Sequence, residues 1–148
     1  PGQKPWQFDG DIAIPCATQN EVTAADAEAM YNHGIRYVVE GANMPLDADA
    51  IDFVRENKMR YAPGKAANAG GVAVSGLEMS QNSVRQYRTF QDVDKQLQII
   101  MRNIHDDAAQ ASEEYGFNQD GCIDYMSGAN IAGYKRVANA LVAYGILN

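Results

Sequence analysis

The first 62 residues alternate between short apolar runs and helix-like segments, and this alternation constrains the fold more than any other feature. The strand-like runs span residues 11–15, 36–40 and 59–62. The helix-like segments between them span residues 23–34 and 47–57. Thr23 can cap the first of these helices, and Ile51 and Val54 give the second an apolar face. The order β-α-β-α-β predicts an α/β fold with a parallel sheet and right-handed crossovers.

Polar residues follow all three expected strands. Thr18, Asn43 and Asn68 lie just after the first, second and third strand. The carboxyl ends of parallel strands share one edge of the sheet, and ligands of open α/β sheets bind there. We therefore expect a ligand site at this edge.

From residue 65 onward the pattern is helical. We expect one helix over about residues 67–87, another over 92–115 and a last one from Asp124 toward Gly145, with Gly116 ending the second. The chain is thus expected to divide into residues 1–64, which carry the sheet, and residues 65–148, which are helical.

Glycines interrupt the expected helix over residues 67–87. Gly70, Gly71 and Gly76 would each cost about 1 kcal/mol relative to alanine in a helix interior. Such glycines are tolerated where another body approaches the backbone closely. Asn68 and Ser75 add hydrogen-bonding groups on one helix face, because they are two turns apart. This segment is typical of a binding wall, although Ser75 could also be a small packing residue and Asn43 a turn residue that bonds its own backbone.

Five motifs resemble, in family order, the hexameric glutamate dehydrogenases of bacteria, within the amino-acid dehydrogenases. They lie at residues 15–20 (PCATQN), 40–45 (EGANMP), 62–72 (APGKAANAGGV), 75–82 (SGLEMSQN) and 128–134 (GANIAGY). The match corresponds to the carboxyl-terminal third of the family's subunit, so we expect a fragment whose remaining strands lie upstream. The resemblance implies that residues 1–64 are the second half of a Rossmann-like nucleotide-binding domain. It also implies that the long helices of residues 65–148 contribute to the active-site cleft.

The resemblance also implies a reaction and site residues. The family deaminates L-glutamate reversibly to 2-oxoglutarate and ammonia with NADP or NAD, and NADP is the expected cofactor from the branch of the family. The matching asparagines, Asn43 and Asn68, are expected at the nicotinamide end of the cofactor. Further cofactor-wall residues are expected at Ala17, Thr18 and Gln19. Ser75 is expected to bind the side-chain carboxylate of glutamate, and Val72 its aliphatic part.

No catalytic residue is expected in this chain. In the family a lysine and an aspartate transfer the protons, and both belong to upstream motifs. The chain also lacks a Gly-x-Gly-x-x-Gly turn for the cofactor pyrophosphate. We therefore expect the 148 residues alone to be inactive. The resemblance also implies that full-length subunits assemble as a homo-hexamer.

Two alternatives remain open. The chain could be a regulatory or oligomerisation module that kept the sequence of a dehydrogenase. Four retained residues speak against this: Asn43, Asn68, Val72 and Ser75. It could also derive from a leucine or phenylalanine dehydrogenase, whose pocket would favour an apolar residue where Ser75 places a hydroxyl.

Composition argues against several other classes. A net charge of −7 disfavours nucleic-acid and anionic-membrane partners. Cys16 and Cys122 form no Cys-x-x-Cys, and His33 and His105 lack metal-ligand spacing, so no metal site is expected. The sequence shows no signal peptide and no long apolar run, so we expect a cytoplasmic protein with reduced cysteines.

Overall fold

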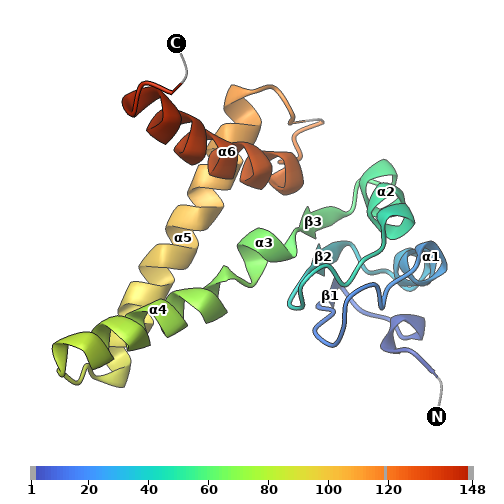
Figure 1. Ribbon diagram of the computed structural model, residues 1–148. Helices are drawn as coiled ribbons and strands as arrows, with labels where there is room; N and C mark the ends of the chain where they lie inside the picture. The colour runs from blue at the N-terminus through green and yellow to red at the C-terminus, as the bar shows by residue number, and fades with distance from the viewer. Residues whose placement is uncertain (1–2, 119, 147–148) are drawn as a thin grey trace. The chain divides into compact units, whose positions relative to one another are not determined.

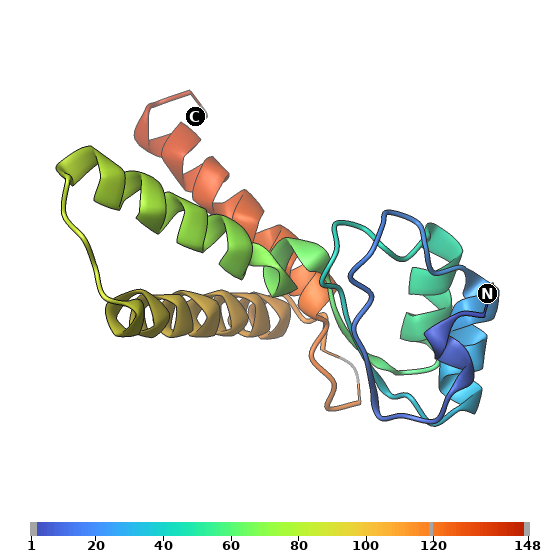
Figure 2. The same ribbon diagram turned by 90° about the horizontal axis from the view of Figure 1, so that it is seen from below.

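A computed structural model describes residues 3–118 and 120–146 (Figures 1 and 2). By its internal contacts the chain forms two compact units, Pro1–Met101 and Arg102–Asn148. We describe each unit by itself. The boundary between the units does not coincide with the expected domain boundary after residue 64, which stays a prediction.

The first unit contains the parallel sheet that the sequence predicts. Its elements up to residue 62 are η1 (Pro5–Gln7), β1 (Ile12–Ala13), α1 (Ala24–Asn32), β2 (Tyr37–Val39), α2 (Ala48–Glu56) and β3 (Arg60–Ala62). The strands pair in the order β1-β2-β3, and both pairs are parallel. All three expected strands and both expected helices are confirmed, with ends that differ by at most two residues.

One face of this sheet is packed and the other is open within the described residues. The side chains of Ala13, Val38 and Tyr61 are buried. Helices α1 and α2 lie side by side on that face (Figures 1 and 2). Side chains alternate across a strand, so the neighbouring Ile12 and Tyr37 point the other way, and they are 58% and 50% exposed. Parallel sheets are normally covered on both faces, and this face departs from that pattern within the described residues.

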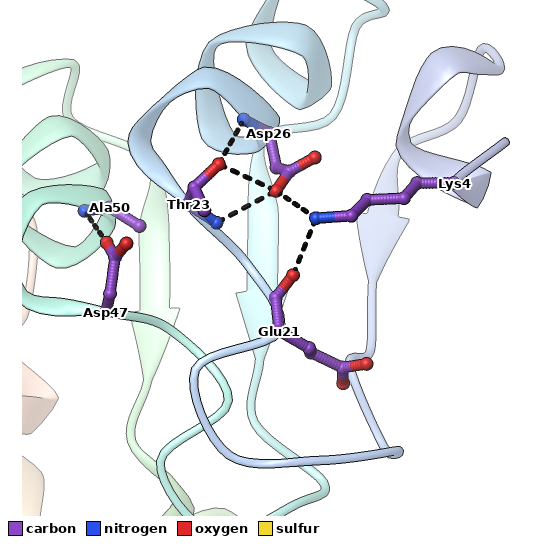
Figure 3. Close-up of polar contacts among 6 residues, drawn as sticks. All are labelled: Lys4, Glu21, Thr23, Asp26, Asp47 and Ala50. Carbon is purple, nitrogen blue, oxygen red and sulfur yellow. Dashed lines mark hydrogen bonds and ion pairs between the residues drawn. The ribbon is translucent and has the colours of Figure 1, made fainter. Parts of the chain in front are cut away.

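Helices α1 and α2 begin at side-chain caps (Figure 3). The Thr23 hydroxyl accepts the N–H of Asp26, and the Asp26 carboxylate accepts the N–H of Thr23, which is a complete capping box. Lys4 donates to Asp26 at 2.6 Å, and Asp47 accepts the N–H of Ala50 at 2.7 Å. Burial alone would raise the pKa of Asp26, but the hydrogen bonds from Lys4 and Thr23 and the charge of Lys4 hold it below its usual value.

The expected single helix over residues 67–87 is wrong in two respects. The structure has α3 (Gly64–Ala67) and α4 (Ala69–Val84), and Asn68 separates them with φ −95° and ψ 2°. Helix α4 ends early because Arg85 takes a left-handed conformation (φ 53°), with Gln86 donating its N–H to the Gln81 carbonyl. Glycine usually fills this left-handed position, so an arginine there gave no signal of a helix end.

Helix α5 (Phe90–Glu114) confirms the expected long helix. It starts two residues earlier than expected because Thr89 accepts the N–H of Asp92 and donates to its carboxylate. Gly116 follows its end in the left-handed conformation (φ 73°), as expected. The boundary between the two compact units falls inside this helix.

The second unit packs the end of α5 against α6 (Tyr125–Ala143). Asp124 caps α6 by accepting the N–H of Ser127, which confirms the expected start. Gly128 is buried on the backbone of α5: an added Cβ would stand 2.0 Å from the Ala108 carbonyl oxygen. Ser112 is buried beside it and accepts the N–H of Asp124. Gly128 therefore permits close approach between the backbones of these two helices.

Candidate functional site

A pocket of about 570 Å³ lies in the first unit, at the carboxyl ends of its three strands. Its wall contains segments that follow each strand. Ligands of open α/β sheets bind at this edge. The lining residues are Cys16, Ala17, Thr18, Gln19, Gly41, Ala42, Asn43, Asn68 and Val72. All five residues expected to face the cofactor are therefore brought together, along with one of the two expected substrate residues.

The two asparagines form a pair. Nδ2 of Asn68 donates to Oδ1 of Asn43 at 2.7 Å. The bond leaves Nδ2 of Asn43 and Oδ1 of Asn68 outside it, one a donor and the other an acceptor. A ligand carboxamide presents the complementary acceptor and donor.

Asn68 departs from the usual behaviour of an asparagine at a helix start. It is the N-cap residue of α4, where an asparagine side chain normally accepts a backbone N–H of the first turn. Its side chain makes no such cap bond and reaches Asn43 instead. The amide is therefore used in the pocket rather than in stabilising the helix.

The loops after β1 and β2 are held close together. The N–H groups of Gly41 and Ala42 both donate to the Pro15 carbonyl at 3.0 Å. An added Cβ at Gly41 would stand 2.4 Å from Sγ of Cys16, so this approach requires glycine. The wall that carries residues 16–19 is thus fixed against the loop that carries Asn43.

Glu40 is a residue of this site that the sequence did not single out. It directly follows β2, and only 3% of it is exposed. Its Oε2 accepts the N–H of Gly64 at 2.6 Å, and its Oε1 accepts the N–H of Leu46 at 3.4 Å. Burial, with the negative charge of Glu40 and a hydrogen bond to it, raises the pKa of the Tyr61 hydroxyl. A charged residue at the end of an otherwise apolar strand was the available signal.

Ser75 does not line the pocket. Asn68 and Val72 line it, and Val72 is 75% exposed, but Ser75 lies further along α4. The Ser75 hydroxyl donates to the Gly71 carbonyl at 3.2 Å, a bond within the helix. Its expected contact with a substrate carboxylate is therefore still a prediction.

The pocket wall can position a ligand but offers little acid-base chemistry. The nine lining residues include no lysine, histidine or carboxylate, and Cys16 is an exposed free thiol. No group of three His, Cys, Asp or Glu residues in the described part of the chain could hold a metal ion. Amides, small side chains and backbone form the wall, and groups of this kind orient a ligand by hydrogen bonds and shape.

Comparisons with known proteins agree with this architecture. The NADP-specific glutamate dehydrogenase of Psychrobacter sp. (strain TAD1) is 66% identical over 146 residues, which is 99% of this chain and 33% of that protein. The NAD-specific glutamate dehydrogenase of Porphyromonas gingivalis is 46% identical, over 99% of this chain and 32% of that protein. The crystal structure of Plasmodium falciparum glutamate dehydrogenase superposes with a TM-score of 0.91 at 44% identity, over 97% of this chain and 30% of that one.

The chain thus spans about a third of the length of the relatives it matches. Its sheet and helices correspond to part of the Rossmann-like fold of glutamate dehydrogenases. The model of the Glutamate/Leucine/Phenylalanine/Valine dehydrogenase family matches residues 1–145. With the expected motifs gathered at the edge of a parallel sheet, the chain belongs to this family of amino-acid dehydrogenases.

Proposed function

We propose that this chain is part of a glutamate dehydrogenase and forms the wall that holds the nicotinamide end of NADP or NAD. The observation that carries the proposal is the Asn43–Asn68 pair, which lies in a pocket at the carboxyl edge of the sheet. The remaining donor and acceptor of the pair can bind the carboxamide of the nicotinamide. Ala17, Thr18 and Gln19 form the neighbouring part of the cofactor wall.

The cofactor supplies the hydride chemistry in this reaction, and the protein supplies orientation. The reaction converts L-glutamate to 2-oxoglutarate and ammonia, with hydride transfer to the nicotinamide. In this proposal Val72 contacts the aliphatic part of glutamate, and Ser75 turns its hydroxyl from the Gly71 carbonyl to the substrate carboxylate. The proton-transferring lysine and aspartate come from outside these 148 residues.

The choice between NADP and NAD rests on the relatives. The 66% identical relative is named NADP-specific and the 46% identical one NAD-specific, which favours NADP for this chain. In the family, the groups that select the ribose 2′-phosphate belong mainly to upstream motifs. The choice of NADP therefore uses none of these groups.

The assembly and the setting are also proposals. The resemblance supports a homo-hexamer of full-length subunits in the cytoplasm, without nucleic-acid or membrane partners. In the described residues, no helix combines the length and the apolar character needed to cross a membrane.

The experiment is to join residues 1–148 to the remaining, upstream part of the Psychrobacter enzyme and to follow cofactor reduction by absorbance. We expect turnover with L-glutamate and NADP, and little with L-leucine or L-phenylalanine. The 148 residues alone should neither reduce NADP with glutamate nor bind it tightly. A joined protein that folds and prefers leucine, or is inactive with every amino acid, would contradict the proposal.

A further inference from the structure

We infer that Glu40 is a positioning residue of this site: its buried carboxylate sets the distance between the two loops that carry Asn43 and Asn68. The inference rests on the proposed function, because the distance between the loops matters only if Asn43 and Asn68 hold the nicotinamide together. Glu40 is not among the residues that line the pocket, and 3% of it is exposed. It therefore acts through the loops and not on the cofactor itself.

Each oxygen of the carboxylate binds a different loop. Oε1 accepts the N–H of Leu46, at the end of the loop that carries Asn43, and Oε2 accepts the N–H of Gly64, at the start of the segment that carries Asn68. The two donors are 6 and 24 residues from Glu40 in sequence. One side chain thus connects two segments that the chain itself joins only through α2 and β3.

If Gly64 moves, Asn68 moves with it. The N–H of Asn68 donates to the Gly64 carbonyl at 3.0 Å, through the single turn of α3. The loops also touch here, since an added Cβ at Gly64 would stand 2.8 Å from the Ala42 carbonyl oxygen. Ala42 is next to Asn43, so the position of Gly64 sets the reach of Asn68 toward Asn43.

The negative charge is needed for this role. A buried carboxylate is tolerated when hydrogen bonds replace water, and bonds to a charged acceptor are roughly twice as strong as neutral ones. Glutamine has nearly the same shape but only one carbonyl oxygen, and its NH₂ group would face the second backbone N–H. Glu40→Gln should therefore release one loop while keeping the volume of the side chain.

The test uses Glu40→Gln in the joined full-length protein of the previous section. We expect the single-turnover rate of hydride transfer to fall between about tenfold and a hundredfold, as for a misplacement near 1 Å. Binding of ADP-ribose, which has the adenosine and pyrophosphate but no nicotinamide, should change by less than about twofold, because the two loops that Glu40 binds carry the residues assigned to the nicotinamide end. This split separates positioning from a general loss of structure.

Three further variants complete the test, two of them as controls. Ser112→Ala removes a buried hydroxyl in the other compact unit and should lower Tm without slowing hydride transfer in the folded protein. Tyr61→Phe removes the hydroxyl that bonds Glu40 and tests the inference if Glu40→Gln does not fold. Tyr61→Phe should slow hydride transfer less than Glu40→Gln does. Tyr37→Phe, on the other face of the sheet, should not slow it.

The outcomes are distinct. If the unsubstituted joined protein does not transfer hydride, the proposed function is wrong. If it does and Glu40→Gln transfers hydride at the same rate, the inference alone is wrong. An equal slowing in Ser112→Ala at matched loss of Tm would also overturn it. Where Glu40→Gln does not fold, unchanged hydride transfer in Tyr61→Phe decides against the inference.

Discussion

Gly64→Ala tests the packing between the two loops of the pocket. The added Cβ would stand 2.8 Å from the Ala42 carbonyl oxygen, 3.3 Å from Oε2 of Glu40 and 3.4 Å from Nδ2 of Asn68. The first contact is with backbone, which cannot rotate away as the end of a flexible side chain can. The loops must therefore separate by a few tenths of an ångström.

The expected cost follows from this overlap. Overpacking a well-packed site typically costs about 1–3 kcal/mol. Replacing glycine also reduces the entropy of the unfolded chain, which favours folding by roughly 0.4–1 kcal/mol. We therefore expect Gly64→Ala to lower the free energy of unfolding by about 1–2 kcal/mol. The Asn43–Asn68 bond, now 2.7 Å, should lengthen and weaken.

Urea unfolding of the 148-residue chain measures this cost. Trp6 is the single tryptophan of the sequence and lies in the same compact unit as Gly64, so its fluorescence reports the relevant transition. Gly71→Ala is the matched control, because an added Cβ at Gly71 meets nothing within 4 Å. Gly71 lies in α4. Gly71→Ala should gain about 0.5–1 kcal/mol from helix propensity. Equal stability of the two variants would refute the packing argument.

Three further predictions concern substrate, pH and helix packing. In the joined full-length protein, Ser75→Ala should cost about 2 kcal/mol, roughly thirtyfold in kcat/KM for glutamate, and leave norvaline turnover nearly unchanged; equal losses would mean that the serine only packs. The pKa of Asp26 is lowered in the folded state, so its stabilisation is present above its unfolded value of about 3.8 and is lost as the pH falls through the folded value. Lys4→Met should therefore cost up to about 1 kcal/mol of unfolding free energy near neutral pH and less near pH 3, and a pH-independent difference would contradict this. Gly128→Ala should lower the unfolding free energy by about 2–3 kcal/mol, because its Cβ collides with the Ala108 backbone, and circular dichroism during urea unfolding measures the loss; no loss would contradict the close helix contact.

The sheet and its ligand edge could be predicted because their signals are local. Thr23 and Asp26 have the spacing of a capping box, and apolar runs of strand length stand on either side of each helix. Parallel strands place their carboxyl ends at one edge, so the pocket position follows from chain order. The residue roles within it came from the resemblance to glutamate dehydrogenases.

The missed features depend on contacts between distant residues. Asn68 lies between α3 and α4, and its amide bonds Asn43, 25 residues earlier. Glu40 is buried because two loops direct backbone N–H groups at it. Helical spacing predicts one face for Asn68, Val72 and Ser75, but spacing along a helix does not determine how far a pocket extends, and Ser75 does not line this one. Helical periodicity contains none of this information.

Hydride transfer in an asparagine double-mutant cycle tests the central claim most directly. In the joined full-length protein, single-turnover rates are measured for Asn43→Ala, Asn68→Ala and the double variant, together with ADP-ribose binding. If the bonded pair holds the nicotinamide, each single substitution should slow hydride transfer at least about tenfold, the double should lose little more than either single, and ADP-ribose should bind within about twofold of the unsubstituted protein. Unchanged hydride transfer in both single variants would contradict the claim that this pocket positions the nicotinamide.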